Sequence, residues 1–191
     1  MKNAIILHGI DDAVEDILAM PNSPSNSHWF PWLQWELIKK GILAQTPEMP
    51  RPYLKDMNYD EWVGIIEQFQ IDKNSILIGH SCGGGFFLKY LSLNPNIKVG
   101  QLVLVAPWLD TEQDSPTFFN NLYLDPDLPA RVGQIDVFLS SDDMDIIKMS
   151  IDKIKSAYDN IIKYHDMGNK GHFCERDLKS KQFPELLAVI K

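Results

Sequence analysis

Short apolar runs alternate with longer amphipathic segments along most of the chain, and this alternation limits the possible folds more than any other feature of the sequence. The runs that we predict to be strands cover residues 3–7, 43–46, 75–78, 102–106, 135–139 and 161–165. All but the second are compact and apolar, as expected of strands that are buried on both faces. The pattern is typical of α/β proteins, in which helices connect parallel strands. It predicts a mostly parallel sheet of about six strands with helices on both faces.

The segments between these runs carry apolar residues at helical spacing. We predict helices over residues 29–39, 60–69, 86–93, 146–158 and 183–190. In the fourth of these, Ile147, Ile151 and Ile154 fall on one helical face. The longest irregular segment, residues 107–133, follows the fourth predicted strand. It is too short for a separate cap domain, so we expect an ordered excursion over one edge of the sheet.

The size and charge of the chain exclude several classes of protein. Its 191 residues suffice for one domain and are few for two, so we expect a single domain over residues 1–191. There are 26 acidic and 18 basic residues, and this net charge of −8 argues against a nucleic-acid partner. The apolar start, residues 4–7, is too short for a signal peptide or a membrane span. We therefore expect a cytoplasmic protein without a membrane partner.

The cysteines and histidines form no recognisable metal motif. The sequence has two cysteines, Cys82 and Cys174, and neither a Cys-x-x-Cys nor a His-Glu-x-x-His pattern. It therefore supports neither a disulfide framework nor a structural zinc site. We expect no metal and no organic cofactor.

A Gly-x-Ser-x-Gly pattern stands directly between the third predicted strand and the helix that follows it. It consists of Gly79, His80, Ser81, Cys82 and Gly83. In α/β-hydrolases this pattern forms a sharp turn that lifts the serine hydroxyl out of the sheet, and the glycines let strand and helix approach closely. Ser81 is therefore the candidate nucleophile. The alternatives are an ordinary strand-to-helix turn and a nucleotide-binding, flavodoxin-like domain, but the phosphate-binding glycine motifs are absent.

Three carboxylates follow the fifth predicted strand, where α/β-hydrolases carry the acid that orients the histidine base. They are Asp142, Asp143 and Asp145. We favour Asp143 because it stands three residues before Ile146, where such a loop turns into its helix. Asp142 is the alternative, and we expect Asp145 to start the helix. The competing interpretation is that all three only cap that helix.

A glycine-containing loop after the last predicted strand presents His172. It follows Ser81 and the aspartates, which is the chain order of an α/β-hydrolase triad. The other histidines, which fit less well because of their positions, are His8 in the first turn, His28 at a helix start, His80 before the nucleophile and His165 at a strand end. We therefore predict a catalytic triad of Ser81, Asp143 and His172.

Two backbone N–H groups are candidates for an oxyanion hole. One is that of Cys82, directly after the nucleophile, and the other is that of Ile10, which follows His8-Gly9 after the first strand. Aromatic residues after the fourth predicted strand are candidates for the acyl pocket. We expect Trp108 and Phe119 to bind substrate there, with a place in the core as the alternative.

With these elements in place, the chain resembles the retinoblastoma-binding-protein-nine and YdeN-like group of small serine hydrolases. The resemblance rests on residues 5–9, 28–33, 79–84, 142–143 and 171–173, of which the Trp- and Pro-containing segment 28–33 is the most specific. It implies a compact α/β-hydrolase fold with little or no cap, and the same triad. The Leu-x-Cys-x-Glu motif, which binds retinoblastoma protein, is absent from this sequence, so we infer no such partner.

These observations predict a serine hydrolase that cleaves a small ester, thioester or amide and therefore takes a small-molecule acyl substrate. The alternative is a catalytically silent protein that kept the fold as a binding module, since a fold does not guarantee turnover.

Overall fold

A six-stranded sheet forms the centre of the computed structural model, which describes residues 1–10, 23–52, 56–115, 117–158 and 161–191. Its order is β2-β1-β3-β4-β5-β6, and all neighbouring strands are parallel. The strands are β1 (Asn3–Leu7), β2 (Leu43–Gln45), β3 (Ser75–His80), β4 (Gln101–Val105), β5 (Ile135–Leu139) and β6 (Lys163–Asp166). The predicted parallel sheet is confirmed.

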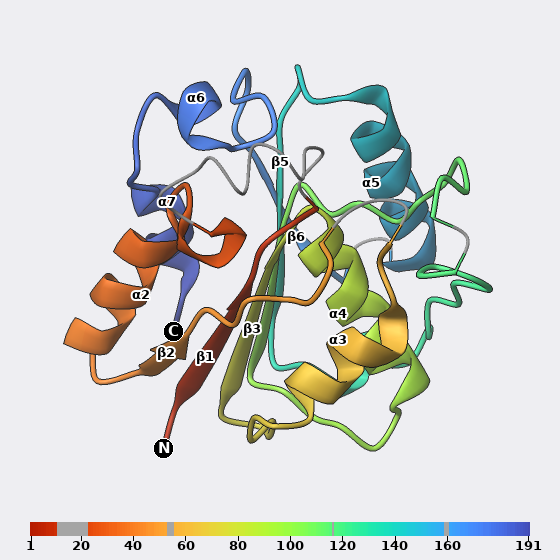
Figure 1. Cartoon of the computed structure of the whole chain (residues 1–191), viewed down its shortest axis with the longest axis horizontal. Helices are drawn as coiled ribbons and strands as arrows, with labels where there is room; N and C mark the ends of the chain where they lie inside the picture. Colours follow the sequence, from red (N-terminus) through yellow and green to blue (C-terminus); the bar gives the residue numbers. More distant parts are fainter. Residues whose placement is uncertain (11–22, 53–55, 116, 159–160) are drawn as a thin grey trace.

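Helices cover both faces of this sheet, as predicted (Figure 1). On one side lie α2 (Phe30–Lys39) and α7 (Pro184–Val189), and on the other α3 (Tyr59–Ile66), α4 (Cys82–Leu93) and α5 (Asp145–Tyr158). The short elements are α6 (Glu175–Leu178) and the 3-10 helices η1 (Pro24–Asn26) and η2 (Leu128–Arg131). None of the helices in the described ranges is both long and apolar enough to cross a membrane.

The order of the strands determines where a site can form. From β1 the chain moves outward to β2 and then returns past β1 to β3, so its direction across the sheet reverses between β1 and β3. In open α/β sheets, ligands bind outside the carboxyl ends of the strands at such a reversal. The end of β1 and the end of β3 lie side by side, because Leu7 is paired with Gly79. Residues 8–10 and Ser81 therefore emerge at the same place.

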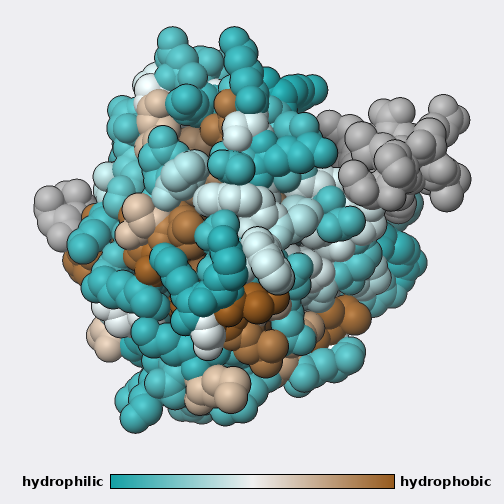
Figure 2. Space-filling view, turned by 90° about the vertical axis from the view of Figure 1, so that its left-hand side faces the viewer, coloured by the Kyte–Doolittle hydropathy of each residue, from teal (hydrophilic) through white to brown (hydrophobic). Residues whose placement is uncertain are grey.

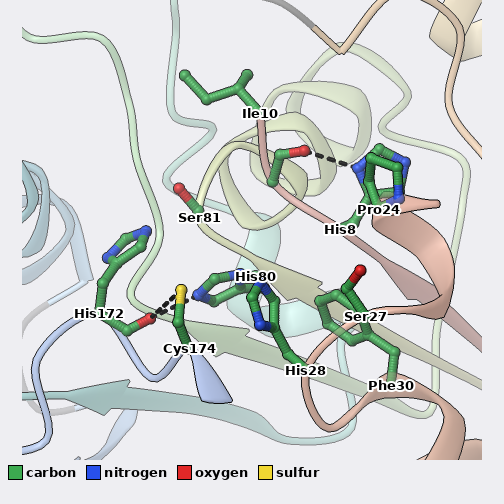
Figure 3. Close-up of a pocket in the computed structure, with 11 residues that line it drawn as sticks. His8, Ile10, Pro24, Ser27, His28, Phe30, His80, Ser81, His172 and Cys174 are labelled. Atoms are coloured by element: carbon green, nitrogen blue, oxygen red, sulfur yellow. Dashed lines mark hydrogen bonds between the residues drawn. The ribbon is translucent and has the colours of Figure 1, made fainter. Parts of the chain in front are cut away.

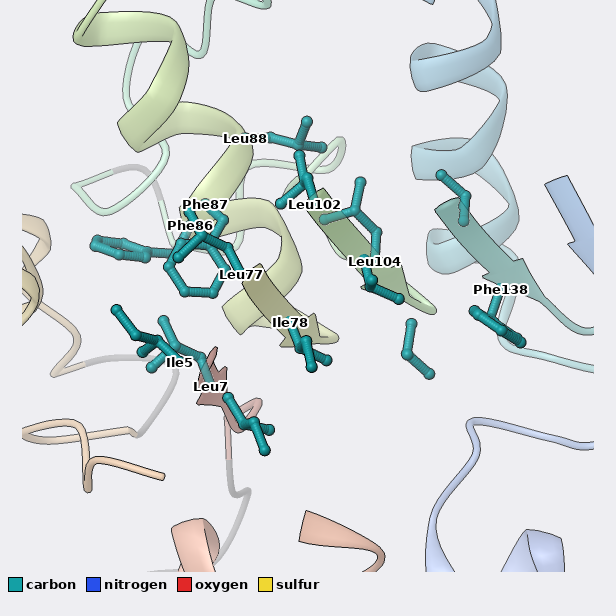
Figure 4. Packing of buried hydrophobic residues seen from close by; sticks show 14 of the residues in the cluster. Ile5, Leu7, Leu77, Ile78, Phe86, Phe87, Leu88, Leu102, Leu104 and Phe138 are labelled. Atoms are coloured by element: carbon teal, nitrogen blue, oxygen red, sulfur yellow. The ribbon is translucent and has the colours of Figure 1, made fainter. Parts of the chain in front are cut away.

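The contact between β3 and α4 is almost completely buried. Every residue of β3 is buried, and so is every residue of α4 except the last. Figure 4 shows Phe86 and Phe87 of α4 packed beside Leu77 of β3. Burying a side chain of this size contributes about 1.5–3 kcal/mol, so this helix and strand form a firm base for the turn between them.

Helix α4 begins at Cys82, four residues before the predicted start at Phe86. Its first turn contains Gly83, Gly84 and Gly85, which are poor helix formers. Tertiary packing overrides this preference. A Cβ at Gly83 would lie 2.5 Å from the carbonyl oxygen of His8, so only glycine lets the first turn of the helix rest on the end of β1.

The excursion of residues 107–133 packs onto the molecule and builds no cap. Its described part contains no α-helix, only η2. Lys89 of α4 donates a hydrogen bond from Nζ to the carbonyl oxygen of Phe118 at 2.6 Å, and the same ammonium lies 4.1 Å from the centre of the Tyr59 ring. Phe118 itself is fully buried. Its ring also meets Tyr59 and Trp62 of α3 edge to face, so the excursion is tied to α3 and α4, as expected of a fold without a large cap.

Helix α2 shows how the opposite face is built. Leu33 and Leu37 are buried towards the sheet, whereas Trp35 and Ile38 point outward with 60% and 45% of their surfaces exposed. Figure 2 views the molecule from this side and shows apolar residues in separate spots among hydrophilic ones. The apolar residues of α2 therefore divide between the core and the surface.

Candidate active site

The turn between β3 and α4 holds Ser81 in a strained conformation. Its φ of 53° and ψ of −121° lie in a region that residues with a side chain rarely adopt. The strain is maintained by backbone hydrogen bonds, since the Ser81 N–H donates to Val105 at 2.9 Å and the Ser81 carbonyl accepts from Trp108 at 3.0 Å. A Cβ at Gly79 would lie 2.5 Å from the backbone of Gly83. The sequence Gly79–Gly83 thus builds the tight turn that its pattern predicts.

The structure brings His172 and Asp143 together. Nδ1 of His172 lies 3.0 and 3.2 Å from the two carboxylate oxygens of Asp143. The carboxylate accepts, so Nδ1 carries the proton and Nε2 is the basic nitrogen of the neutral ring. The Asp143 side chain is only 1% exposed, which shields this pair from water. Ser81 and His172 both line one pocket and lie on the same side of it (Figure 3).

The other two carboxylates of this loop are occupied elsewhere. One oxygen of Asp142 accepts the Ser140 hydroxyl at 2.7 Å and the Gly171 N–H at 2.8 Å. These two hydrogen bonds, that of Ser140 first, lower the pKa of Asp142. Asp145 is the first residue of α5. Of the three aspartates, only Asp143 therefore contacts the His172 ring. Asp142 instead binds the backbone of the loop that contains His172.

Backbone from β1 approaches the nucleophile from the other side. A Cβ at Gly9 would lie 2.8 Å from Cβ of Ser81, so only glycine permits this approach. Nε2 of His8 accepts the N–H of Met49 at 3.0 Å, and Nδ1 of the same ring therefore carries the proton and donates to the carbonyl of Gly9 at 2.6 Å. Because C=O and N–H point in opposite directions across a trans peptide, His8 turns the N–H of Ile10 away from its own ring.

The pocket is small, about 100 Å³, and is lined by side chains from four parts of the chain. The lining residues are His8, Gly9, Ile10, Pro24, Ser27, His28, Phe30, His80, Ser81, His172 and Cys174. Among the residues that the structure describes, no lysine, arginine, aspartate or glutamate lines this pocket. Sequence analysis did not predict pocket roles for Pro24, Ser27 and Phe30. The Trp- and Pro-containing segment at 28–33 is a sequence signal for His28 and Phe30, whereas Pro24 and Ser27 lie before it and carry no such signal.

Trp108 and Phe119, the expected substrate-binding residues, lie in the core. They are 4% and 5% exposed, their rings meet edge to face at 5.3 Å, and neither lines the pocket at Ser81. The reason is Gly85 of α4: a Cβ there would collide with the Trp108 carbonyl and lie 2.8 Å from the Phe119 ring. The missing side chain lets the excursion sink onto the helix, and this buries both aromatic residues.

Within the described ranges, no group of three or more His, Cys, Asp or Glu side chains is arranged to hold a metal ion. The polar groups that the described residues give to the pocket are the hydroxyls of Ser27 and Ser81, the Cys174 thiol, four imidazoles and backbone groups.

Comparison with known proteins connects this geometry to a family. A family model described as serine hydrolase matches residues 20–191. YdeN of Bacillus subtilis (strain 168) is 26% identical over 180 residues, which cover 91% of this chain and 87% of that protein. The solved structure of the B. subtilis ydeN gene product has a TM-score of 0.78 and 23% identity, covering 99% of this chain and 96% of its own. Est1E from Butyrivibrio proteoclasticus, solved with ferulic acid bound, has a TM-score of 0.62 and 13% identity, covering 94% of this chain and 84% of its own.

Proposed function

Because the chain belongs to the serine hydrolase family, we propose that it hydrolyses a small ester, thioester or amide through an acyl-enzyme formed on Ser81. One observation carries this proposal: a strained serine shares a pocket with a histidine whose Nδ1 is held by a buried aspartate. Such a serine becomes nucleophilic when the imidazole takes its proton, and the carboxylate fixes the tautomer that makes this possible.

The proposed reaction proceeds in two steps. Oγ of Ser81 attacks the carbonyl carbon while Nε2 of His172 accepts the hydroxyl proton, and the same proton passes to the departing alcohol, thiol or amine as its bond to carbon breaks. Water then attacks the acyl-enzyme, His172 takes a proton from the water, and the acid product leaves as that proton returns to Ser81. Asp143 stabilises the imidazolium that forms in both steps.

The N–H groups of Cys82 and Ile10 are the proposed donors to the oxyanion. Cys82 is the first residue of α4, and a first-turn N–H has no acceptor within its helix. The helix also directs its positive end towards the negative charge that develops. Ile10 lines the pocket, and the His8–Gly9 hydrogen bond supports an N–H that points away from the His8 ring.

The experiment that tests this function uses an activated-serine probe. A fluorophosphonate should label the wild-type protein at Ser81, and labelling should be absent from Ser81→Ala. The same two proteins are then compared on a panel of p-nitrophenyl esters, acyl thioesters and aminoacyl amides. A folded wild-type protein that is neither labelled nor active on the panel would contradict the proposal and favour a silent binding module.

The small pocket also predicts which acyl chains are preferred. Sites that enclose drug-sized ligands have volumes of roughly 300–1,000 Å³, whereas this one has about 100 Å³. Each buried methylene contributes about 0.8 kcal/mol, so selectivity should rise only while carbons still fit. We expect kcat/KM for p-nitrophenyl esters to peak at roughly two to six carbons. A steady rise towards dodecanoate would show that the site is deeper than this pocket.

A further inference from the structure

His80 is a buried imidazole beside the nucleophile, and the proposed mechanism does not use it. It is the last residue of β3, directly before Ser81, and only 4% of its surface is exposed. Nε2 of His80 lies 2.7 Å from the backbone carbonyl oxygen of His172. A carbonyl can only accept, so Nε2 carries the proton and donates it. The residue before the nucleophile is thus bonded to the backbone of the base.

The surroundings of His80 keep its ring neutral and fixed. Burial lowers its pKa well below the usual value for histidine, and the neighbouring His172 lowers it further. Rings of Trp29 and Phe30 each lie 6.0 Å from the His80 ring, and that of His28 lies 6.3 Å away. Since these rings hold the imidazole from several directions, its N–H points steadily at one acceptor.

The segment that bears His172 needs such an anchor. Asp143 holds the His172 ring, and other side chains, one near in sequence and one distant, hold the backbone around it. The N–H of His172 donates to Asp177 at 3.1 Å, and the next carbonyl, that of Phe173, accepts the Trp29 Nε1–H at 3.1 Å. Phe173 has a φ of 59°, a conformation that costs a residue with a side chain of order 1–3 kcal/mol. The buried Phe173 side chain, together with the hydrogen bonds from Trp29 and His80, holds this strained backbone in place.

We propose that His80 is a positioning residue, which holds His172 at its working distance from Ser81 through the hydrogen bond from Nε2 to the His172 carbonyl. The inference rests on the proposed function of Ser81 and His172. His80 and Ser81 are consecutive residues, so the end of one buried strand bears both the nucleophile and the anchor of its base. The bond therefore connects the residue before the nucleophile to the backbone of the base, across 92 positions of sequence.

The test compares two substitutions that differ mainly in the donor. His80→Gln retains an N–H at about the distance of Nε2, whereas His80→Met fills a similar volume without one. For His80→Met we expect kcat on p-nitrophenyl butyrate and the fluorophosphonate labelling rate to fall about 10- to 100-fold, because displacing a reacting group by about 1 Å has effects of this size. KM should change less than about twofold, because the ester itself is not bound by this N–H. His80→Gln should recover most of the lost rate, to within about fivefold of wild type on the same argument.

Circular dichroism and thermal unfolding establish that each variant is folded. Should His80→Met not fold, His80→Asn takes its place, because its amide ends one bond short of the carbonyl. Equal losses in the donor and non-donor variants would overturn the proposal and assign the effect to packing. So would a raised KM with unchanged kcat, which would make His80 a substrate contact. A wild-type protein that is not labelled at all would instead refute the proposed function.

Discussion

The turn that bears Ser81 and the loop that bears His172 line the same pocket, yet they are held in different ways. Most of what fixes the turn is close to it in sequence, because the whole of β3 is buried, α4 starts at the next residue and glycines close the gap between them. Val105 and Trp108 add backbone hydrogen bonds from the end of β4 and the segment after it. The loop is mostly half-exposed and follows an edge strand, β6. It is held by Trp29, His80 and Asp142, which lie far from it in the sequence. The nucleophile is thus built mainly from consecutive residues, whereas its base depends more on partners that are distant in sequence.

The largest expected effect on kcat comes from removing the nucleophile on the turn or the base on the loop. Ser81→Ala and His172→Ala should each lower kcat on an activated ester by about 10⁵- to 10⁶-fold while leaving the protein folded. The double variant should lose little more than either single one, because nucleophile and base act as a unit. Steady-state kinetics with circular dichroism on the same samples measures this. Substantial turnover by either single variant would exclude the proposed pair.

The next effect separates the two aspartates beside the loop. Asp143→Asn should lower kcat by about 10³- to 10⁴-fold, because an amide favours the wrong imidazole tautomer. Asp142→Asn should cost much less, since an amide oxygen can still accept the Gly171 N–H. Comparing kcat for the two variants decides the assignment. The reverse order would move the acid to Asp142, and two small effects would mean that this loop does not supply the acid.

A third prediction concerns the stability of the turn itself. Gly83→Ala places a Cβ 2.5 Å from the His8 carbonyl, and overpacking of this kind should lower the free energy of unfolding by about 1–3 kcal/mol. Gly64→Ala is the matched control, because Gly64 lies in α3 with nothing within 4 Å of the added atom. The control should raise stability by up to about 1 kcal/mol. Urea denaturation at neutral pH measures both. Equal effects would show that α4 does not rest tightly on β1.

The smallest expected effect is a pH dependence of the free energy of unfolding, which arises from His80 between the turn and the loop. The pKa of His80 is lowered in the folded protein, so below about pH 6.5 the unfolded chain binds a proton that the folded protein does not. The free energy of unfolding is therefore highest above that pH and decreases as the pH falls below it. We expect His80 to account for about 1 kcal/mol of this loss between pH 7 and pH 5.5.

Urea denaturation of the wild type and of His80→Gln over this range isolates the contribution. The histidines that face His80, namely His8, His28 and His172, are present in both proteins, so their titration largely cancels in the difference. Parallel pH profiles for the two proteins would mean that His80 is not held neutral by burial.

Most of the fold was predictable because its signals are local. Each strand was expected within two residues of its observed bounds. The four central strands stand out because they are short, buried apolar runs, whereas the edge strands β2 and β6 are largely exposed or half-buried. The predicted helix ends were less accurate wherever packing outweighed propensity, as at Gly83. The short α6 and the two 3-10 helices were not predicted, because a single turn leaves no periodic pattern.

By itself, the sequence determined the alternation of strands and helices, the turn at Ser81, and the chain order of serine, aspartate and histidine, all of which are written in consecutive or regularly spaced residues. Only the tertiary structure decided which aspartate reaches His172, that Trp108 and Phe119 are buried, and that His80 is bonded to the loop. These outcomes depend on distances between segments tens of residues apart. Such distances arise when the sheet assembles and buried donors must find acceptors, and no local pattern encodes them.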